Sequence, residues 1–206
     1  MSRVIRRSAT VRGRFLRSVG SLSDRPRWNL HEIAILGRSN AGKSSLLNAL
    51  LGARGLARTS KTPGRTRALN FFAFGDELAL VDLPGYGYAQ LSKASAQALS
   101  KLLYGYLRTE QNLIGALMVT DARRGPEAEE IELAELIRGR ELGLILAVSK
   151  CDKLARHERS AALERYAALA ARPVLCSALE GEGIEELRRR LGELLRIARE
   201  NLRRNC

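Results

Sequence analysis

The chain has 206 residues, 45% of them hydrophobic, and this length suits a single domain with a sizeable core. Its formal net charge of +13 exceeds what a small-ligand pocket needs and points to a polyanionic partner. Three cysteines and two histidines at no zinc-binding spacing argue against a structural metal, and no apolar run reaches the about 18 residues of a membrane span. We therefore expect a cytoplasmic protein with reduced thiols and no membrane partner.

The first 27 residues carry about half of the excess charge. They contain eight arginines against one acid, Asp24. A field of this sign steers a protein towards phosphate backbones and makes its affinity depend on salt. A solvated tail that keeps the chain soluble is the alternative. We predict a basic arm over residues 1–27 and one folded domain over residues 28–206.

Short apolar runs alternate with longer helical patterns, an order typical of a parallel sheet with helices on both faces. The predicted strands are 32–36, 69–74, 78–82, 116–120, 144–149 and 173–176. The predicted helices are 43–51, 92–109, 127–140, 156–171 and 184–203. Gly75 and Asp76 make a short connection, which predicts an antiparallel hairpin between the second and third strands. The expected fold is three-layer α/β, with six mostly parallel strands and one antiparallel edge strand.

Residues 37–44 read Gly-Arg-Ser-Asn-Ala-Gly-Lys-Ser, a complete G-x-x-x-x-G-K-[ST] phosphate-binding loop between a predicted strand and a predicted helix. In such a loop the glycines let backbone N–H groups approach phosphate oxygens. Lys43 adds a charge for the β- and γ-phosphates, and Ser44 offers a hydroxyl to Mg²⁺. The helix N-terminus also favours anions. This context predicts a nucleotide site.

Two further motifs follow predicted strands. Asp82-Leu-Pro-Gly85 places a carboxylate where Mg²⁺ needs one and leaves the Gly85 N–H near a γ-phosphate, although alone it is only a turn motif. Ser149-Lys-Cys-Asp152 ends the fifth strand with a carboxylate that can accept from N1–H and the exocyclic amine of guanine. A helix N-cap is the alternative role for that Asp. The long loop 52–67, basic and rich in Thr, is of a length that is usually functional or disordered.

Taken in order, these segments resemble the EngB family of ribosome-biogenesis GTPases, within the translation-factor and Ras-like class of P-loop GTPases. The similarity covers nearly the whole chain. It rests on the phosphate loop with the preceding Glu32-Ile-Ala, on residues 56–60, 63–66 and 69–72, and on Asp82-Leu-Pro-Gly-Tyr-Gly-Tyr-Ala89. It implies GTP or GDP and Mg²⁺ as ligands and a monomeric switch in assembly of the large (50S) ribosomal subunit. The implied partners are the subunit precursor and rRNA, with links to the cell cycle, cell division and septation.

The resemblance also assigns roles to individual residues. The expected catalytic residues are Lys43, Thr66 and Gly85, and the expected Mg²⁺ ligands are Ser44, Thr66 and Asp82. The expected phosphate-binding residues are Gly37, Arg38, Ser39, Asn40, Ala41, Gly42, Lys43, Ser44, Ser45, Gly64, Arg65, Thr66, Asp82, Leu83, Pro84 and Gly85. The expected guanine-binding residues are Ser149, Lys150, Cys151, Asp152, Cys176, Ser177 and Ala178. Thr66 lies in the long loop, which becomes the first switch, and residues 86–93 follow Gly85 as the second.

Three positions qualify these assignments. Ras-like enzymes place a water-orienting Gln directly after Asp-x-x-Gly, where this chain has Tyr86, so we expect slow intrinsic hydrolysis. Ser149 stands where Asn or Thr is usual, and it keeps a hydroxyl. Asn40 has two open roles: it recruits a catalytic K⁺, as in relatives that share it, or it braces the loop by hydrogen bonding.

Two other functions remain open from the sequence. A nucleotide-dependent kinase also uses a phosphate loop, but the order of the Asp82 and Asp152 motifs argues against it. A non-catalytic RNA-binding module with a structural nucleotide is the second. Three smaller alternatives concern single features: Trp28 is an anchor or a base-stacking ring, Cys151 is a filler or an oxidisable thiol, and the arginines of the last helix contact rRNA or solvent.

Overall fold

The computed structural model describes residues 12–57, 68–87 and 92–204. Its centre is a sheet in the order β1-β3-β4-β2-β5-β6-β7. The strands are β1 (Arg14–Val19), β2 (His31–Gly37), β3 (Leu69–Phe74), β4 (Leu78–Asp82), β5 (Leu113–Asp121), β6 (Gly143–Ser149) and β7 (Val174–Cys176). The α-helices are α1 (Lys43–Leu50), α2 (Lys93–Thr109), α3 (Ala128–Gly139), α4 (Arg159–Tyr166) and α5 (Ile184–Arg204). Short 3₁₀ turns lie at Leu22–Asp24, Cys151–Lys153 and Arg156–Glu158.

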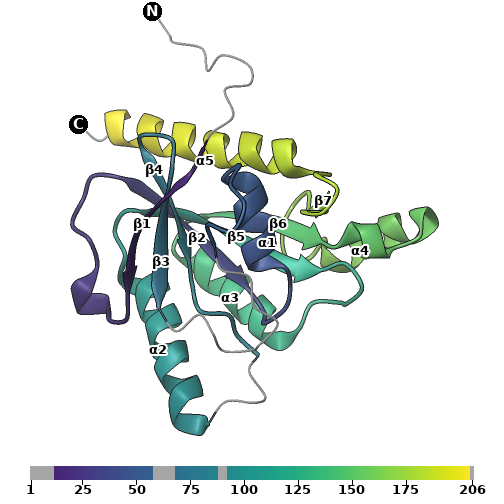
Figure 1. The fold of residues 1–206 in the computed structure, drawn as a ribbon, viewed down its shortest axis with the longest axis horizontal. Helices are drawn as coiled ribbons and strands as arrows, with labels where there is room; N and C mark the ends of the chain where they lie inside the picture. Colours follow the sequence, from purple (N-terminus) through teal and green to yellow (C-terminus); the bar gives the residue numbers. More distant parts are fainter. Residues whose placement is uncertain (1–11, 58–67, 88–91, 205–206) are drawn as a thin grey trace, which may run out of the picture.

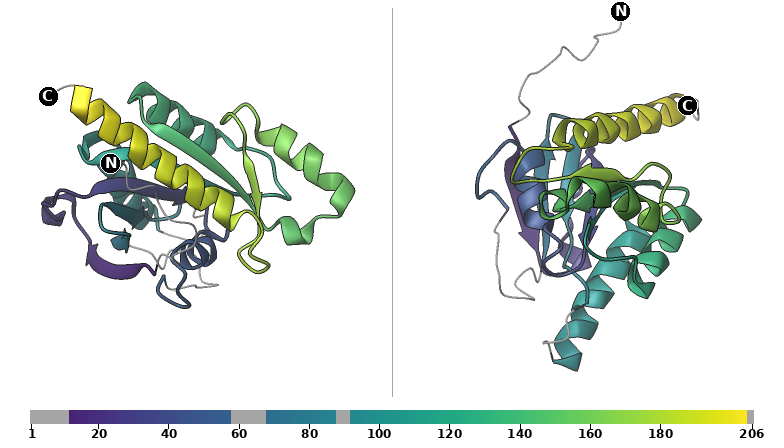
Figure 2. Two further views of the ribbon diagram at one scale, coloured as in Figure 1. Left: turned by 90° about the horizontal axis from the view of Figure 1, so that it is seen from above. Right: turned by 90° about the vertical axis from the view of Figure 1, so that its right-hand side faces the viewer.

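Helices cover both faces of the sheet (Figure 1). Leucines of α1 and α5 share one apolar cluster with one face, while α2, α3 and α4 join a second cluster on the other. The right-hand view in Figure 2 shows α5 along one side of the sheet and α2 and α3 along the opposite side. The fold is the predicted three-layer α/β arrangement.

Parallel pairing at the centre of the sheet positions the functional loops. β2 pairs in parallel with both β4 and β5, and β5 pairs in parallel with β6. The apolar residues Ile33 to Leu36 of β2 are at most 1% exposed, as expected for a strand covered on both faces. Because the strands run the same way, the loops after β2, β4, β5 and β6 emerge at one edge.

The predicted strand count is wrong by one. A seventh strand, β1, lies inside the segment predicted to be the basic arm, and it pairs antiparallel with β3. It occupies the edge of the sheet, so β3, which we expected there, is an interior strand. Arginines on the outer edge and a register shift between Phe15 and Arg17 hide the alternation that normally reveals a strand.

Both ends of β1 are fixed to the segments that frame the long basic loop. The Gly13 N–H donates to the carbonyl of Leu51 at 2.7 Å, just after α1. A Cβ at Gly13 would lie 2.3 Å from the Leu51 side chain, so only glycine fits this approach. At the other end, Val19 pairs with Leu69, the first residue of β3. At its two ends, β1 is therefore bonded to the residue just after α1 and to the first residue of β3. Residues 52–68 connect these same two points along the chain.

A buried cluster connects the residues before β2 to α2. The Trp28 ring packs edge-on against Phe71, with 5.4 Å between centroids, and its Nε1 donates to Glu32 at 2.7 Å. The Tyr106 hydroxyl donates to the other oxygen of Glu32 at 2.5 Å. Trp28 is thus an anchor of the preceding segment, as the first of its two predicted roles requires.

One predicted helix is shorter than expected. The segment 156–171 forms a 3₁₀ turn and then α4, which ends at Tyr166. Arg172 has a positive φ of 61° directly before Pro173. The residue before a proline is disfavoured in the helical region, so the chain leaves the helix before β7.

Candidate functional site

The backbone of the phosphate loop is left-handed at two positions. It joins the end of β2 to the start of α1, and Asn40 and Gly42 have positive φ values of 66° and 96°. A Cβ at Gly37 would lie 2.8 Å from the carbonyl oxygen of Val119 in β5, so this position requires glycine. The loop is therefore packed directly against the neighbouring strand.

The N–H groups of this loop divide into two sets. Ser39 donates to the carbonyl of Tyr86 at 3.0 Å, and Ala41 donates to that of Arg38 at 3.1 Å. The first helical bond runs from Leu46 to Gly42 at 2.9 Å. The N–H groups of the first turn of α1 have no intrahelical partner, and the helix dipole is positive there. This turn is the part of the loop suited to an anion.

Lys43 and Asp82 meet beside the loop. Register places Asp82 opposite Ile35 of β2, and the Lys43 ammonium donates to the Asp82 carboxylate. The ammonium also donates to the Leu83 carbonyl at 2.8 Å. Both side chains are buried, at 7% and 3% exposure. Two motifs 39 positions apart thus form one charged pair.

The residues described here fit a magnesium ion. Ser44 follows Lys43 in the first turn of α1 and offers a hydroxyl, while Asp82 offers a carboxylate. Mg²⁺ prefers oxygen ligands and is usually held by one or two protein groups together with waters and substrate phosphates. The third expected ligand, Thr66, and the neighbouring Gly64 and Arg65 lie outside the described residues.

The start of the long loop is held by a residue that sequence reasoning did not single out. Asn48 of α1 accepts from the Ala57 N–H at 2.7 Å and donates to the Ala57 carbonyl at 2.8 Å. Ala57 is 2% exposed. An Asn inside a helix gives no local signal of such a contact, because its partner is nine residues away.

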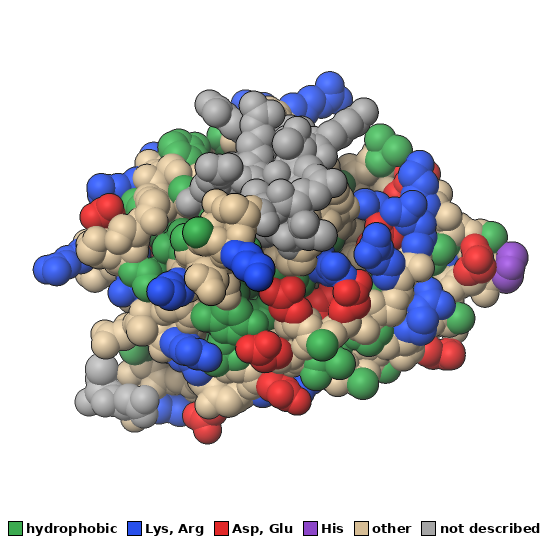
Figure 3. Space-filling view, turned by 90° about the horizontal axis from the view of Figure 1, so that it is seen from below, with side chains coloured by type: hydrophobic (Ala, Val, Ile, Leu, Met, Phe, Trp, Pro, Cys, Tyr) green, Lys and Arg blue, Asp and Glu red, His purple; other side chains and the backbone are tan. Residues whose placement is uncertain are grey.

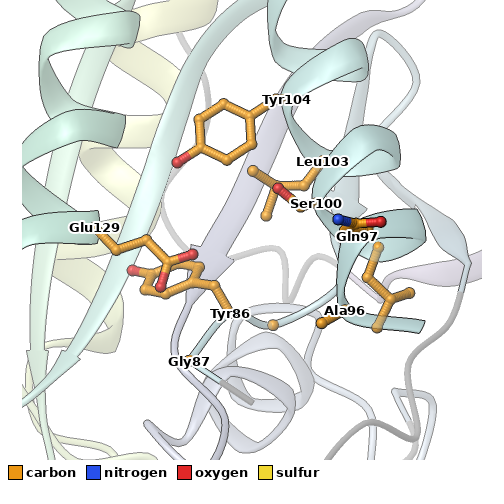
Figure 4. A pocket seen from close by; sticks show the side chains of 10 residues that line it. Tyr86, Gly87, Ala96, Gln97, Ser100, Leu103, Tyr104 and Glu129 are labelled. Atoms are coloured by element: carbon orange, nitrogen blue, oxygen red, sulfur yellow. The ribbon is translucent and has the colours of Figure 1, made fainter. Parts of the chain in front are cut away.

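Residues after Asp82 return to the phosphate loop. Tyr86 forms an isolated parallel bridge with Arg38, and the Arg38 guanidinium pairs with Glu127 before α3. The Tyr86 side chain is 4% exposed and lines a pocket between α2 and α3 (Figure 4). Pro84 and Gly85 are buried beside it. The side chain at the position of the usual Gln is thus packed into the protein.

The end of β6 is bonded to the phosphate loop. Ser149 donates from its hydroxyl to the Ala41 carbonyl, and the Lys150 ammonium donates to the Asn40 carbonyl, each at 2.5 Å. Lys150 also donates to Asp121, at the end of β5, at 3.0 Å. Burial alone would raise the pKa of Asp121, but hydrogen bonds from Arg123 and Lys150 hold it well below its usual range. Asp121 is a site residue that we did not predict.

The expected guanine-reading carboxylate is oriented by a hydroxyl from the next strand. Ser177, after β7, donates to Asp152 at 2.7 Å, and this bond lowers the pKa of the Asp152 carboxyl. Cys151 and Cys176 are buried beside it, and burial raises the pKa values of their thiols to about 11 and about 12. Both thiols are therefore packed inside the protein beside the expected guanine site. Ala178 follows Ser177 and is half-buried.

Charge is unevenly distributed over the face that carries these loops. Figure 3 shows acidic side chains near the centre of this face and basic ones on both sides. Most arginines of α5 are paired within or beside the helix: Arg188 with Glu185, Arg189 and Arg190 with Glu186, Arg196 with Glu200, and Arg199 with Glu77. By contrast, Arg14 and Arg17 are exposed on the edge strand β1.

A phosphate loop whose helix starts beside a Lys–Asp pair, on a mixed sheet with a second carboxylate after β6, is the arrangement of P-loop GTPases. The family model described as 50S ribosome-binding GTPase matches residues 32–150. The probable GTP-binding protein EngB of Ruegeria pomeroyi is 43% identical over 181 residues, covering 84% of this chain and 83% of that protein. That of Chlorobium luteolum is 39% identical over 180 residues, covering 86% and 87%. The chain belongs to the EngB family of GTP-binding proteins and is a GTPase.

Solved structures agree with this membership. A crystal structure of a probable GTP-binding protein EngB superposes with a TM-score of 0.66 at 26% identity, covering 80% of this chain and 98% of that one. Era in complex with MgGDPNP and nucleotides 1506–1542 of 16S ribosomal RNA gives 0.62 at 25% identity, covering 80% and 56%. No helix in the described ranges is both long and apolar enough to cross a membrane.

Proposed function

We propose that this GTPase is a nucleotide-dependent switch in assembly of the large ribosomal subunit, acting as a monomer in the cytoplasm on the subunit precursor and its rRNA. The observation that carries the switch is the bonding of the phosphate loop to two other segments, the end of β4 with the residues after it and the end of β6. Lys43 contacts Asp82, Ser39 contacts Tyr86, and Ala41 contacts Ser149. A change at the phosphates would therefore alter the contacts of the segments after β4 and after β6.

The residues of the site divide the chemistry among them. Lys43 and the N–H groups of the first turn of α1 bind and polarise the phosphates, and Asp82 and Ser44, with Thr66, hold Mg²⁺. The metal supplies charge neutralisation at the β- and γ-phosphates when it is bound. Asp152 reads guanine, with Ser177 orienting it. Tyr86 is packed away from solvent, which supports slow intrinsic hydrolysis.

The two roles of Asn40 stay open. The bond that holds this residue to the end of β6 runs from Lys150 to its backbone carbonyl, so it does not depend on the Asn side chain. A comparison of GTP hydrolysis in KCl and NaCl, on wild type and Asn40→Ala, separates the roles. A K⁺ stimulation that Asn40→Ala removes assigns the ion; loss of activity equal in both salts assigns the brace.

The RNA contact is best placed at the edge strand β1. Arg14 and Arg17 are exposed there, whereas the α5 arginines named above are largely neutralised by their own glutamates. We expect Arg14→Gln/Arg17→Gln to weaken binding to ribosomal particles and to reduce its salt dependence. The matched control is Arg196→Gln/Arg199→Gln, which removes the same charge from α5. Equal weakening by both pairs would contradict this placement.

Co-sedimentation with large-subunit precursors tests the switch as a whole. We expect association with a GTP analogue and release with GDP. Equal association in both states would refute gating. Inorganic phosphate formed without any phosphorylated acceptor would exclude the kinase alternative, and turnover lost in Asp82→Ala would exclude a purely structural nucleotide.

A further inference from the structure

A buried carboxylate at the end of β5 has no role in the chemistry proposed above. Asp121 is the last residue of this strand and is 7% exposed. Its backbone lies opposite Ser149 of β6, and its carbonyl accepts from the Tyr166 hydroxyl at 3.1 Å. The backbone of Asp121 is therefore fixed by contacts that do not involve its side chain.

The Asp121 carboxylate holds two cations. Its Oδ1 accepts from the backbone N–H of Arg123 at 3.1 Å and from the Arg123 Nε at 2.9 Å. Its Oδ2 accepts from the Arg123 Nη2 at 2.7 Å and from the Lys150 ammonium at 3.0 Å. Hydrogen bonds between charged groups are stronger than those between neutral groups. Arg123 thus fixes the orientation of the carboxylate, and the carboxylate in turn holds Lys150.

The Lys150 side chain crosses from the end of β6 to the phosphate loop. A Cβ at Gly42 would lie 3.6 Å from the Lys150 Cε, so the stem of the lysine passes beside the loop there. The ammonium then reaches the Asn40 carbonyl at 2.5 Å. Because Lys150 lies two positions before Asp152, a nucleotide that bridges the proposed base-reading segment and the phosphate loop lies along this stem.

Lys150 needs more than one acceptor to keep this position. Its side chain is 29% exposed, and an ammonium on a four-carbon stem is flexible and strongly hydrated. A single carbonyl gains little against water for such a group, whereas a carboxylate adds its charge to the hydrogen bond. Asp121 supplies that charge from a buried and already oriented position.

We propose that Asp121 is a positioning residue for nucleotide binding, because its carboxylate holds Lys150 across the phosphate loop in the orientation that the nucleotide requires. Asp121 acts through Lys150 and does not contact the nucleotide itself. The inference rests on the proposed placement of Lys150 in the guanine site. It concerns the affinity for the nucleotide and not the rate of the chemical step.

The test is a double-mutant cycle between Asp121 and Lys150 on the full chain. A fluorescent GDP analogue gives the affinity, and phosphate release at saturating GTP gives kcat. We expect Asp121→Asn to weaken GDP binding about tenfold and to leave kcat within about twofold of wild type. In Lys150→Met, which already lacks the ammonium, Asp121→Asn should change the affinity by less than about twofold. The control Asp76→Asn, exposed in the turn between β3 and β4, removes the same charge and should leave the affinity unchanged.

A merely structural role for Asp121 predicts a different pattern. The carboxylate would then act through Arg123 to order the residues after β5, so Arg123→Gln would reproduce the loss of affinity. We expect Arg123→Gln to cost less than about threefold, because the N–H of residue 123 still donates to the carboxylate. Asp121→Glu moves the carboxylate by one methylene and takes the place of Asp121→Asn if that variant does not fold. It should weaken GDP binding about threefold, again only where Lys150 is present.

An unchanged GDP affinity in Asp121→Asn would overturn the inference. An equal loss with and without Lys150, or a fall in kcat as large as the fall in affinity, would overturn it in favour of a structural role. Wild-type affinity in Lys150→Met would refute the placement of Lys150 itself, and the inference with it. A weakened Lys150→Met beside an unaffected Asp121→Asn would refute the inference alone.

Discussion

The Ser149 hydroxyl donates a hydrogen bond of 2.5 Å to the carbonyl of Ala41, and so joins the end of β6 to the middle of the phosphate loop. Both atoms are buried, and 108 residues separate them in the chain. The same loop receives the Lys150 ammonium one residue earlier, at Asn40. The segment proposed to read the base and the phosphate loop are thus bonded directly to each other.

We therefore expect Ser149→Ala to weaken GDP and GTP binding by about five- to tenfold, equivalent to roughly 1 kcal/mol for one lost hydrogen bond. Ser149→Thr keeps the hydroxyl and should restore most of the affinity. Titration with a fluorescent nucleotide measures both. Ser160→Ala, on the surface of α4, is the control, and an unchanged dissociation constant in Ser149→Ala would contradict the link.

Lys43→Ala should destabilise the nucleotide-free protein by about 3 kcal/mol, because it leaves the Asp82 carboxylate buried without its counterion. Lys43→Ala/Asp82→Ala should recover much of this loss while still failing to bind GTP. Urea unfolding followed by circular dichroism gives the free energies. If the double variant is as unstable as Lys43→Ala, the loss of stability does not come from an unpaired, buried Asp82 carboxylate.

Asp152→Asn should change the preferred base from guanine to xanthine, since the amide offers a donor where the carboxylate only accepts. We expect xanthosine triphosphate to bind this variant more tightly than GTP, with Asp24→Asn as a control that leaves GTP preferred. Competition binding between GTP and xanthosine triphosphate measures the preference of each variant. A variant that still prefers GTP would remove Asp152 from the guanine site.

Asn48→Ala should cost about 2 kcal/mol of unfolding free energy, since it removes both hydrogen bonds to Ala57. Asn48→Asp keeps the acceptor for the Ala57 N–H and should cost about half as much. Hydrogen exchange at the Ala57 amide reports the contact directly. Protection at Ala57 that persists in Asn48→Ala would show that another group holds this end of the loop.

Burial raises the pKa of Glu32 to about 7, despite the hydrogen bonds from Tyr106 and Trp28. The folded protein therefore keeps a proton on Glu32 at pH values where the unfolded chain has lost it. Its contribution makes stability fall as pH rises from 4.5 to about 7, and above that range the contribution is constant. Over this range the free energy of unfolding falls by up to roughly 3 kcal/mol, because each unit of pKa difference corresponds to about 1.36 kcal/mol.

Glu32→Gln should flatten this dependence, measured as urea midpoints between pH 5 and pH 8. Burial also raises the pKa of Glu130 to about 7, so a smaller slope of the same sign should remain. Glu180→Gln, which is exposed, should leave the slope as in wild type. A Glu32→Gln slope equal to wild type would contradict the burial of an ionisable group at this position.

The order of elements and the main motifs were predictable because their signals are local. The phosphate loop needs eight consecutive residues, and the apolar runs of β2, β5 and β6 are continuous because parallel strands are covered on both faces. Asp82 and Asp152 were found because each belongs to a short motif at the end of a predicted strand. Strand β1 was missed because an edge strand with outward arginines carries little apolar alternation.

By itself, then, the sequence determined the class of protein: a phosphate loop followed in order by the Asp82 and Asp152 motifs, on a chain with alternating strands and helices. Only the tertiary structure decided which side chains meet across it. Asn48 bonds the backbone of Ala57, and the side chains of Lys43 with Asp82 and of Lys150 with Asp121 meet from different elements. Such contacts depend on how the layers of the fold pack together. The sequence of one segment therefore does not show which residues of another segment it will contact.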